Sequence, residues 1–171
     1  LAGEHLDAFY QPEDIQRSNQ EHFEEIIYVL VWVAIIDAFQ HWIYENPNHN
    51  QEERTQVWLD IHKRYGGELI DWADLQDIRK SLWHRQLHIF EAPFYYIEYG
   101  IAQLGALQIW QNARQDKEAA LELYKKGLAL GGSRPLPEIY QAAGIKFDFT
   151  AETIAPLIKA VGNELGRSEE H

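Results

Sequence analysis

Histidine and tyrosine side chains gather in one stretch of the sequence, residues 83–100. If this stretch is helical, a rotation of about 100° per residue brings its polar side chains within about 80° of one another on one face. The residues on that face are His84, His88, Glu91, Tyr95 and Tyr99. Imidazole and phenol groups donate hydrogen bonds to a developing oxyanion, so the face could stabilise a transition state without a nucleophile. Pro93 interrupts the stretch, because proline lacks a backbone donor and kinks a helix.

Two other interpretations of these residues stay open. The rings could be core side chains of an amphipathic helix, with their polar tips hydrogen-bonded to neighbours. Alternatively, His84 and His88 could share a metal ion, because they are four residues apart, although the sequence offers no identifiable third ligand. We expect His41, His49 and His62 to be surface or packed side chains.

Known motifs for metal and phosphate binding are absent from the sequence. A zinc-peptidase helix needs His-Glu-x-x-His, with the glutamate as general base, but no histidine here is followed by glutamate. A carboxylate-bridged di-iron site needs glutamate three residues before histidine on two helices, and no histidine has that spacing. The glycine pairs 66–67 and 131–132 lack the further glycines of a phosphate-binding loop, so they indicate helix ends.

The composition bounds the class of protein. A length of 171 residues suits one compact domain, or a piece of a larger one. Against 27 Asp+Glu the chain has 15 Lys+Arg, and the net charge of −12 disfavours nucleic acid and acidic membranes as partners. With 46% hydrophobic and 13% aromatic residues the chain can bury a core, which excludes wholesale disorder.

Cysteine content, apolar runs and the N-terminus bear on the cellular compartment. The chain has no cysteine, which excludes disulfides and thiolate metal sites, and the cytoplasm is the default expectation. The strongly apolar run 26–36, which contains no charged residue, has 11 residues, whereas a membrane span needs about 20. The run therefore indicates a core element rather than a membrane helix. The start at Leu1 does not resemble a signal peptide, and the lack of methionine suggests a processed or excised piece.

Helical periodicity dominates the chain and predicts an all-α fold. The helices expected outside the central stretch are 13–46, 52–65, 116–130, 135–143 and 150–165. Their boundaries follow from Asn46-Pro47, the glycine pairs and an N-terminal cap at Thr150. The β-branched residues of 29–36 leave a strand as an alternative there. The polar tail from Gly166 to His171 is expected to be frayed.

The central stretch, residues 71–110, predicts the longest helix or two nearly collinear ones. Apolar residues recur at helical spacing on either side of Pro93, and Asp71 is positioned to cap the N-terminus. Ala102 and Ala106 continue the face of Tyr95 and Tyr99 with small side chains, which would let another element or a ligand approach closely. The face could thus form one wall of a cleft.

Several segments together resemble a known peptidase family. Residues 88–102 (HIFEAPFYYIEYGIA), 131–137 (GGSRPLP) and 142–145 (AAGI) are similar to the C-terminal region of the oligoendopeptidase F branch of thimet-type zinc metallopeptidases. Residues 37–44 (DAFQHWIY) resemble the same branch. The matched segments occur in the family's order and extend over essentially the whole chain.

The resemblance implies a role for this region in a zinc metalloendopeptidase that hydrolyses short peptides. It assigns substrate contact and transition-state stabilisation to His88 and Tyr99, with Tyr95 or Tyr96 as the second tyrosine; His84 and Glu91 are expected to contact substrate. The family's zinc ligands and general base lie before this region, so the resemblance implies zinc in a parent enzyme whose N-terminal part is the missing partner. Residues 1–171 would then be a single all-α portion of the catalytic domain, without the zinc-binding helix.

Two expectations and one alternative follow for the isolated chain. Without zinc ligands it should not hydrolyse peptides by this route, and exposed aromatic residues of a channel wall should promote self-association. The alternative is a non-catalytic helical interaction domain, in which the His/Tyr face is core and the acidic surface binds a basic partner.

Overall fold

The computed structural model describes residues 2–67 and 70–166, and within these ranges it contains helices and no strand. The all-α prediction is therefore confirmed, and the strand alternative for residues 29–36 is wrong. The tail 167–171, predicted to be frayed, lies outside the described residues. The chain divides into two compact units, Tyr28–Ile101 and Leu1–Ile27 with Ala102–His171, and each is described by itself. The prediction of a single all-α region stays a prediction.

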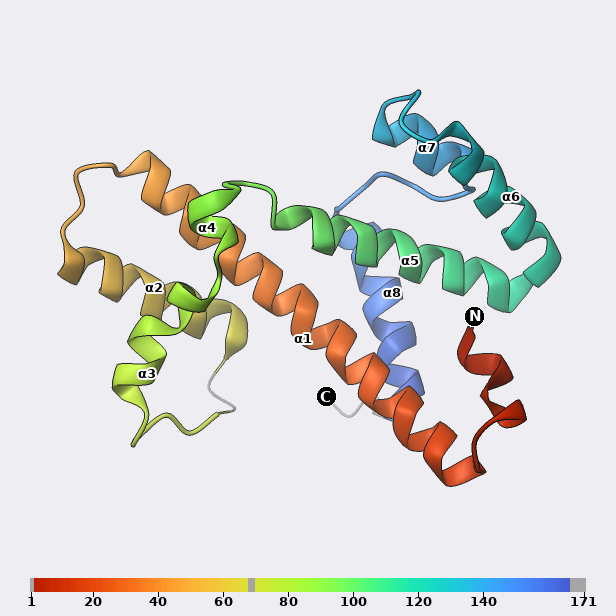
Figure 1. Ribbon diagram of the computed structural model, residues 1–171, viewed down its shortest axis with the longest axis horizontal. Coiled ribbons are helices and arrows are strands. Elements are labelled where there is room, and N and C mark those ends of the chain that lie inside the picture. The colour runs from red at the N-terminus through yellow and green to blue at the C-terminus, as the bar shows by residue number, and fades with distance from the viewer. Residues whose placement is uncertain (1, 68–69, 167–171) are drawn as a thin grey trace. The chain divides into compact units, whose positions relative to one another are not determined.

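The helices follow one another with short connections (Figure 1). Their bounds, with two 3-10 helices labelled η, are η1 Ala2–Ala8, α1 Pro12–Glu45, α2 Gln51–Gly66, α3 Gln76–Ser81, η2 Leu82–Arg85, α4 His88–Glu91, α5 Ile97–Gln115, α6 Lys117–Leu130, α7 Leu136–Ala142 and α8 Ala151–Glu164. Five of them match the helices predicted outside the central stretch to within two residues at each end.

Helix α1 is the longest described helix, with 34 residues. By length and composition alone it is apolar enough to cross a membrane, a property that it shares with core helices of water-soluble proteins. Ile36 and Phe39 of this helix are completely buried within the Tyr28–Ile101 unit. The absence of a membrane span stays a prediction.

The core of the Tyr28–Ile101 unit is aromatic. Figure 1 shows α2, α3 and α4 gathered around the second part of α1. Phe39 meets Trp58 of α2 and Trp83 of η2 edge-on, with ring centroids 5.0 and 5.3 Å away. Edge-to-face packing suits the positive edges and negative faces of aromatic rings. This core therefore links α1 to the helices that lead into the histidine and tyrosine stretch.

Helix α2 begins and ends with recognisable caps. Asn50 Oδ1 accepts from the Glu53 backbone at 2.9 Å, and Glu53 Oε2 accepts from the Asn50 backbone at 2.8 Å, which forms a capping box. The helix ends at Gly66, and the next residue, Gly67, has a φ of 68°, a conformation that favours glycine.

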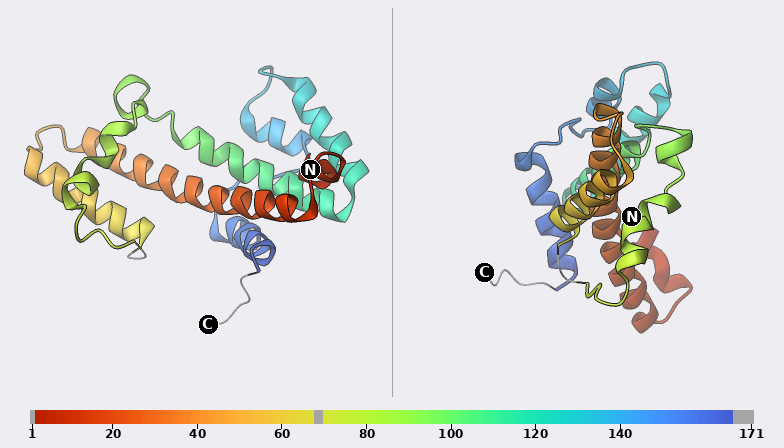
Figure 2. Two further views of the ribbon diagram at one scale, coloured as in Figure 1. Left: turned by 60° about the horizontal axis from the view of Figure 1, so that its bottom comes forward. Right: turned by 90° about the vertical axis from the view of Figure 1, so that its left-hand side faces the viewer.

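In the other unit, α7 folds back against α6 (Figure 2). Asp116 caps α6 by accepting from the Ala119 backbone at 3.0 Å. Gly127 of α6 allows the close approach, because a Cβ there would lie 2.8 Å from the Ala143 Cβ and 3.2 Å from the Ile139 carbonyl.

Thr150 occupies the predicted N-cap position of α8, but the predicted capping hydrogen bond is absent. Instead its side chain donates to Asp148 Oδ2 at 3.0 Å, and Asp148 Oδ1 accepts from the Thr150 backbone at 3.1 Å. A hydrogen bond from the Thr153 side chain, together with these two from Thr150, holds the pKa of Asp148 below its usual value.

The prediction of a nearly continuous helix over 71–110 is wrong. That region contains α3, η2, α4 and the start of α5, with breaks at 86–87 and 92–96. Asp71 Oδ1 accepts from the Ala73 backbone at 2.9 Å, which forms a turn five residues before α3 begins. Leu75 and Ile78 are exposed rather than part of a buried stripe.

The second break has a tertiary cause. Phe94 follows Pro93 and has a φ of 63°, which is uncommon for a residue with a Cβ. Its backbone N–H donates to Oε1 of Gln40, a completely buried side chain of α1, at 3.0 Å. Gln40 thus replaces the hydrogen-bond partner that a continuous helix would have supplied.

Candidate functional site

His88, Tyr95, Tyr96 and Tyr99 form one contiguous group, here called the His88–tyrosine cluster. His88 begins α4, Tyr95 and Tyr96 lie in the turn before α5, and Tyr99 is in the first turn of α5. His88 Nε2 lies 3.3 Å from Tyr99 Oη, within hydrogen-bonding distance. The imidazole plane is parallel to Tyr95 at 6.2 Å and perpendicular to Tyr99 at 5.6 Å, between ring centroids.

Exposure differs within the cluster. Tyr95 and Tyr99 are 53% and 45% exposed, whereas His88 and Tyr96 are half-buried. Burial raises the pKa of Tyr96 above its ordinary value, and Tyr28 and Tyr99 act in the same direction, although Arg85 and the Trp32 indole oppose it. Tyr96 therefore keeps its proton and remains a possible donor, while the rings of Tyr95 and Tyr99 are more accessible to a ligand.

The turn that carries Tyr95 and Tyr96 is held from α1. Besides the Gln40 hydrogen bond, the Phe94 ring packs between His41 and Tyr44, with centroids 4.9 and 5.1 Å away. His41 Nε2 lies 3.6 Å from Asp37 Oδ2 on the same helix. The expectation that His41 is a packed or surface residue agrees with this place beside the turn.

His88 also has a partner on its other ring nitrogen. Gln86 Nε2 lies 2.7 Å from His88 Nδ1, and Gln86 Oε1 accepts from the Trp32 indole at 3.1 Å. Gln86 and Trp32 were not predicted to belong to the site, because 54 positions separate them and no local pattern connects the two. Arg85 lies beside them, with its guanidinium 5.0 Å from the Trp32 ring centroid.

The remaining predicted site residues lie apart from the cluster's ring contacts. His84 belongs to η2, is exposed, and packs its ring against Trp83 at 4.1 Å. Glu91 ends α4 with an exposed side chain. The single helical face predicted for all five residues is wrong, since separate elements carry them. Nevertheless, the turn at 92–96 brings Tyr95 and Tyr99 to His88, and the choice between Tyr95 and Tyr96 stays open because both contact it.

The residues that the structure describes do not fit a zinc site. Across the described ranges 2–67 and 70–166, no three His, Asp, Glu or Cys side chains are grouped so that they could hold a metal ion. His84 and His88, considered as a metal-binding pair on one helix, belong to two different helices. The described part of the chain therefore offers no set of ligands for a zinc ion.

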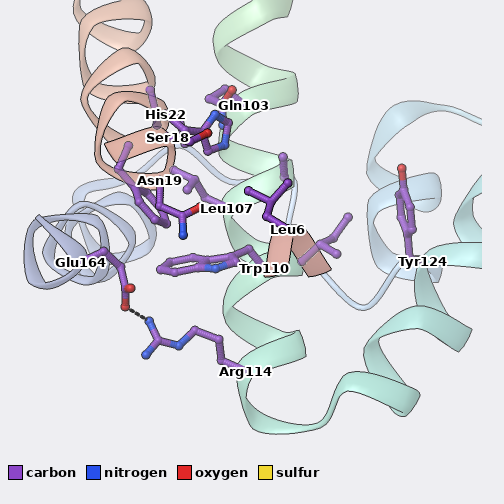
Figure 3. A pocket seen from close by; sticks show the side chains of 14 residues that line it. Leu6, Ser18, Asn19, His22, Gln103, Leu107, Trp110, Arg114, Tyr124 and Glu164 are labelled. Atoms are coloured by element: carbon purple, nitrogen blue, oxygen red, sulfur yellow. Dashed lines mark hydrogen bonds and ion pairs between the residues drawn. The ribbon is translucent and has the colours of Figure 1, made fainter. Parts of the chain in front are cut away.

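A cavity of about 700 Å³ lies in the other unit and was not anticipated (Figure 3). Phe23 and Trp110 pack in its wall with ring centroids 5.3 Å apart. The Arg114 guanidinium lies 5.1 Å from the Trp110 centroid and pairs with Glu164 of α8. The rest of the lining mixes aliphatic side chains with polar ones such as Ser18, Asn19 and Gln103, and it shares no residue with the His88–tyrosine cluster.

Comparison with known proteins decides the family. The sequence profile of peptidase family M3 matches residues 2–157, nearly the whole chain. The chain belongs to peptidase family M3. A curated relative in this comparison is the oligoendopeptidase F homolog of Borreliella burgdorferi (strain ATCC 35210 / DSM 4680 / CIP 102532 / B31), which is 26% identical over 100 residues. That match includes 56% of this chain and 16% of the relative.

Solved structures agree with the M3 assignment. A 3.1 Å X-ray structure described as oligoendopeptidase F superimposes with a TM-score of 0.83 at 34% identity, over 92% of this chain and 28% of that one. A crystal structure described as oligoendopeptidase F from Bacillus anthracis str. Ames gives a TM-score of 0.72 at 28% identity, over 94% of this chain and 25% of that one. The predicted resemblance to the oligoendopeptidase F branch is confirmed. The chain spans less than a third of the length of each of these M3 relatives.

Proposed function

We propose that this chain is the substrate-binding and transition-state-stabilising wall of a zinc metalloendopeptidase that hydrolyses short peptides. Membership of family M3 and the likeness to oligoendopeptidase F support a peptidase. The observation that carries the assignment of the wall is the 3.3 Å approach of His88 Nε2 to Tyr99 Oη beside exposed tyrosine rings. The proposal assigns zinc and its ligands to residues outside this chain, and the cytoplasm stays the proposed location.

In this proposal the cluster acts by donating hydrogen bonds. His88 and Tyr99 present their polar atoms to one place, so a carbonyl oxygen bound there can accept from both. The hydrogen bonds from these donors would become stronger as the carbonyl oxygen gains negative charge. They would therefore stabilise the transition state more than the bound substrate. Tyr95 or Tyr96 would hold the substrate backbone, and His84 and Glu91 would contact the peptide farther from the reacting carbonyl.

The first test compares the chain alone with the chain together with a polypeptide that carries His-Glu-x-x-His and a further glutamate ligand. Hydrolysis of short fluorogenic peptides is expected only in the second case. Zinc-dependent cleavage by the purified 171-residue chain would overturn the assignment of the metal ligands to another part.

The second test addresses the cluster itself in the assembled peptidase. Tyr99→Phe is expected to lower kcat by about 100-fold or more with little change in KM, because it removes a donor used mainly in the transition state. Tyr65→Phe is a matched control, since Tyr65 is a comparably exposed tyrosine on α2. An unchanged kcat in Tyr99→Phe would refute the role of the cluster and favour the non-catalytic interaction domain.

A further inference from the structure

Three side chains form a chain of hydrogen bonds that ends on His88. Trp32 Nε1 donates to Gln86 Oε1 at 3.1 Å, and Gln86 Nε2 lies 2.7 Å from His88 Nδ1. An indole N–H is a donor only, so the Gln86 oxygen must face Trp32. The Gln86 NH₂ group then faces His88 and can only donate to it.

This polarity fixes the proton on the imidazole. Because Gln86 donates to Nδ1, that nitrogen must offer its lone pair, and the neutral ring carries its proton on Nε2. Nε2 is the nitrogen that lies 3.3 Å from Tyr99 Oη. We propose that Gln86, anchored by Trp32, is a positioning residue that holds His88 as the Nε2–H tautomer, with its donor directed into the His88–tyrosine cluster.

The anchor is well held. Trp32 is buried and meets Trp58 edge-on at 6.0 Å between ring centroids, while Tyr28 stacks parallel to it at 6.5 Å. Reversal of the Gln86 amide would place two N–H donors against each other at Trp32 and lose the hydrogen bond between the two side chains. The packing of the Trp32 ring therefore selects the amide orientation, and the amide orientation selects the tautomer.

The advantage of a fixed His88 tautomer rests on the proposed function. A neutral histidine stabilises an oxyanion only through a nitrogen that carries a hydrogen, and the Nδ1–H tautomer would direct a lone pair toward Tyr99 and the substrate. Fixing the tautomer in advance removes the cost of rearranging the ring during the reaction. The tautomer itself can be measured without substrate or metal.

The test uses two-bond ¹H–¹⁵N NMR correlations of histidine rings in the complete 171-residue chain at slightly alkaline pH. Wild-type His88 is expected to show unprotonated Nδ1 and protonated Nε2. Gln86→Glu replaces the donor to Nδ1 with a carboxylate that accepts, so the Nδ1 signal should shift to the protonated position. Gln141→Glu, an exposed change on α7, adds the same charge as a control and should leave His88 unchanged.

A second variant tests the anchor. Trp32→Phe keeps an aromatic ring but removes the indole donor, so the Gln86 amide is free to reverse and an Nδ1–H population should appear. Retention of the native fold is checked by circular dichroism. An Nδ1–H tautomer in the wild-type chain, or an unshifted Nδ1 signal in folded Gln86→Glu, would overturn the inference.

Activity of the assembled peptidase separates this inference from the proposed function. Gln86→Glu is expected to lower kcat about tenfold or more with little change in KM. If the tautomer changes but kcat does not, the catalytic role of His88 fails while the tautomer assignment stands. If Tyr99→Phe lowers kcat but Gln86→Glu leaves the Nδ1 signal unshifted, the proposed function stands and the positioning role of Gln86 fails.

Discussion

The indole of Trp58 donates to the backbone carbonyl of Arg79 at 2.7 Å and so joins α2 to α3. The Arg79 side chain returns to α2, where its Nη2 lies 3.4 Å from His62 Nδ1. Its guanidinium lies 5.6 Å from the Trp72 ring centroid. His62 is thus buried between two tryptophans and beside a permanent positive charge. Burial lowers the pKa of His62 below 6.5, and the Arg79 charge lowers it further.

This environment predicts that the unit loses stability in mild acid. Below about pH 6.5 the unfolded chain binds a proton at His62 that the folded chain does not, so the free energy of unfolding falls as the pH falls. The loss stops once the pH is below the lowered pKa of folded His62. Urea unfolding between pH 8 and pH 5 measures it, with a slope of up to about 1.4 kcal/mol per pH unit from this one group.

Two variants assign the effect to its cause. His62→Gln removes the titrating group and is expected to flatten the profile between pH 8 and pH 5. Arg79→Gln removes the neighbouring charge together with the guanidinium contacts to His62 and Trp72, so the onset of the loss should stay near pH 6.5 while the total loss becomes smaller. A His62→Gln profile that parallels the wild type would show that other groups cause the dependence.

The aromatic core predicts a large effect at Phe39. Phe39→Ala leaves a cavity between Trp58 and Trp83 and is expected to lower the free energy of unfolding by about 3–5 kcal/mol. Leu87→Ala, at a side chain that is mostly exposed, should change it by less than about 0.5 kcal/mol. Urea denaturation followed by tryptophan fluorescence compares them, and similar losses in both variants would contradict this core.

Two helical glycines should respond oppositely to the same substitution. Gly162→Ala places its methyl group in open space and should stabilise α8 by about 0.5–1 kcal/mol through helix propensity. Gly127→Ala forces a methyl group against Ala143 and the Ile139 carbonyl, so a net loss of about 1–2 kcal/mol is expected. Thermal unfolding measures both, and stabilisation by Gly127→Ala would show that α6 and α7 are not closely packed.

Exposed aromatic side chains predict self-association of the isolated chain. Phe90, Phe94, Tyr95 and Tyr99 all lie within ten residues of one another and are each more than 40% exposed. Sedimentation velocity at rising concentration should show species larger than the 20.0 kDa monomer. Phe90→Ser with Tyr95→Ser should reduce them, and a monomer at every concentration would contradict the prediction.

Local signals in the sequence predict much of this fold because the residues that set the boundaries are close together. Asn50 and Glu53 cap α2 from within one turn, and Asp116 caps α6 in the same way. Periodicity therefore places these helices to within two residues. The central stretch differs, because its apolar spacing fits a helix while Pro93 and the buried Gln40 fix a turn there instead. Gln40 is 54 positions from Phe94, and single-sequence periodicity carries no information about that contact.

In the candidate site, too, the sequence predicted what depends on local signals and did not predict what depends on long-range contacts. His88, Tyr95, Tyr96 and Tyr99 were found from residue type, spacing and resemblance, and the structure brings their rings together through a turn instead of a helical face. Gln86 and Trp32, which set the orientation of His88, have no sequence signal because Trp32 packs from α1. The residues that we propose to act on the substrate were thus easier to predict than the residues that we propose to orient them.

The hydrogen bond from the Phe94 amide to Gln40 allows the opening of this turn to be measured by hydrogen–deuterium exchange. Most amides in turns exchange with solvent deuterium quickly, whereas the Phe94 amide is bonded to a side chain with no exposed surface. Its exchange requires the turn to leave α1, which would carry Tyr95 and Tyr96 away from His88. The exchange rate of that single amide would therefore report how often the arrangement of rings comes apart, and how quickly it returns.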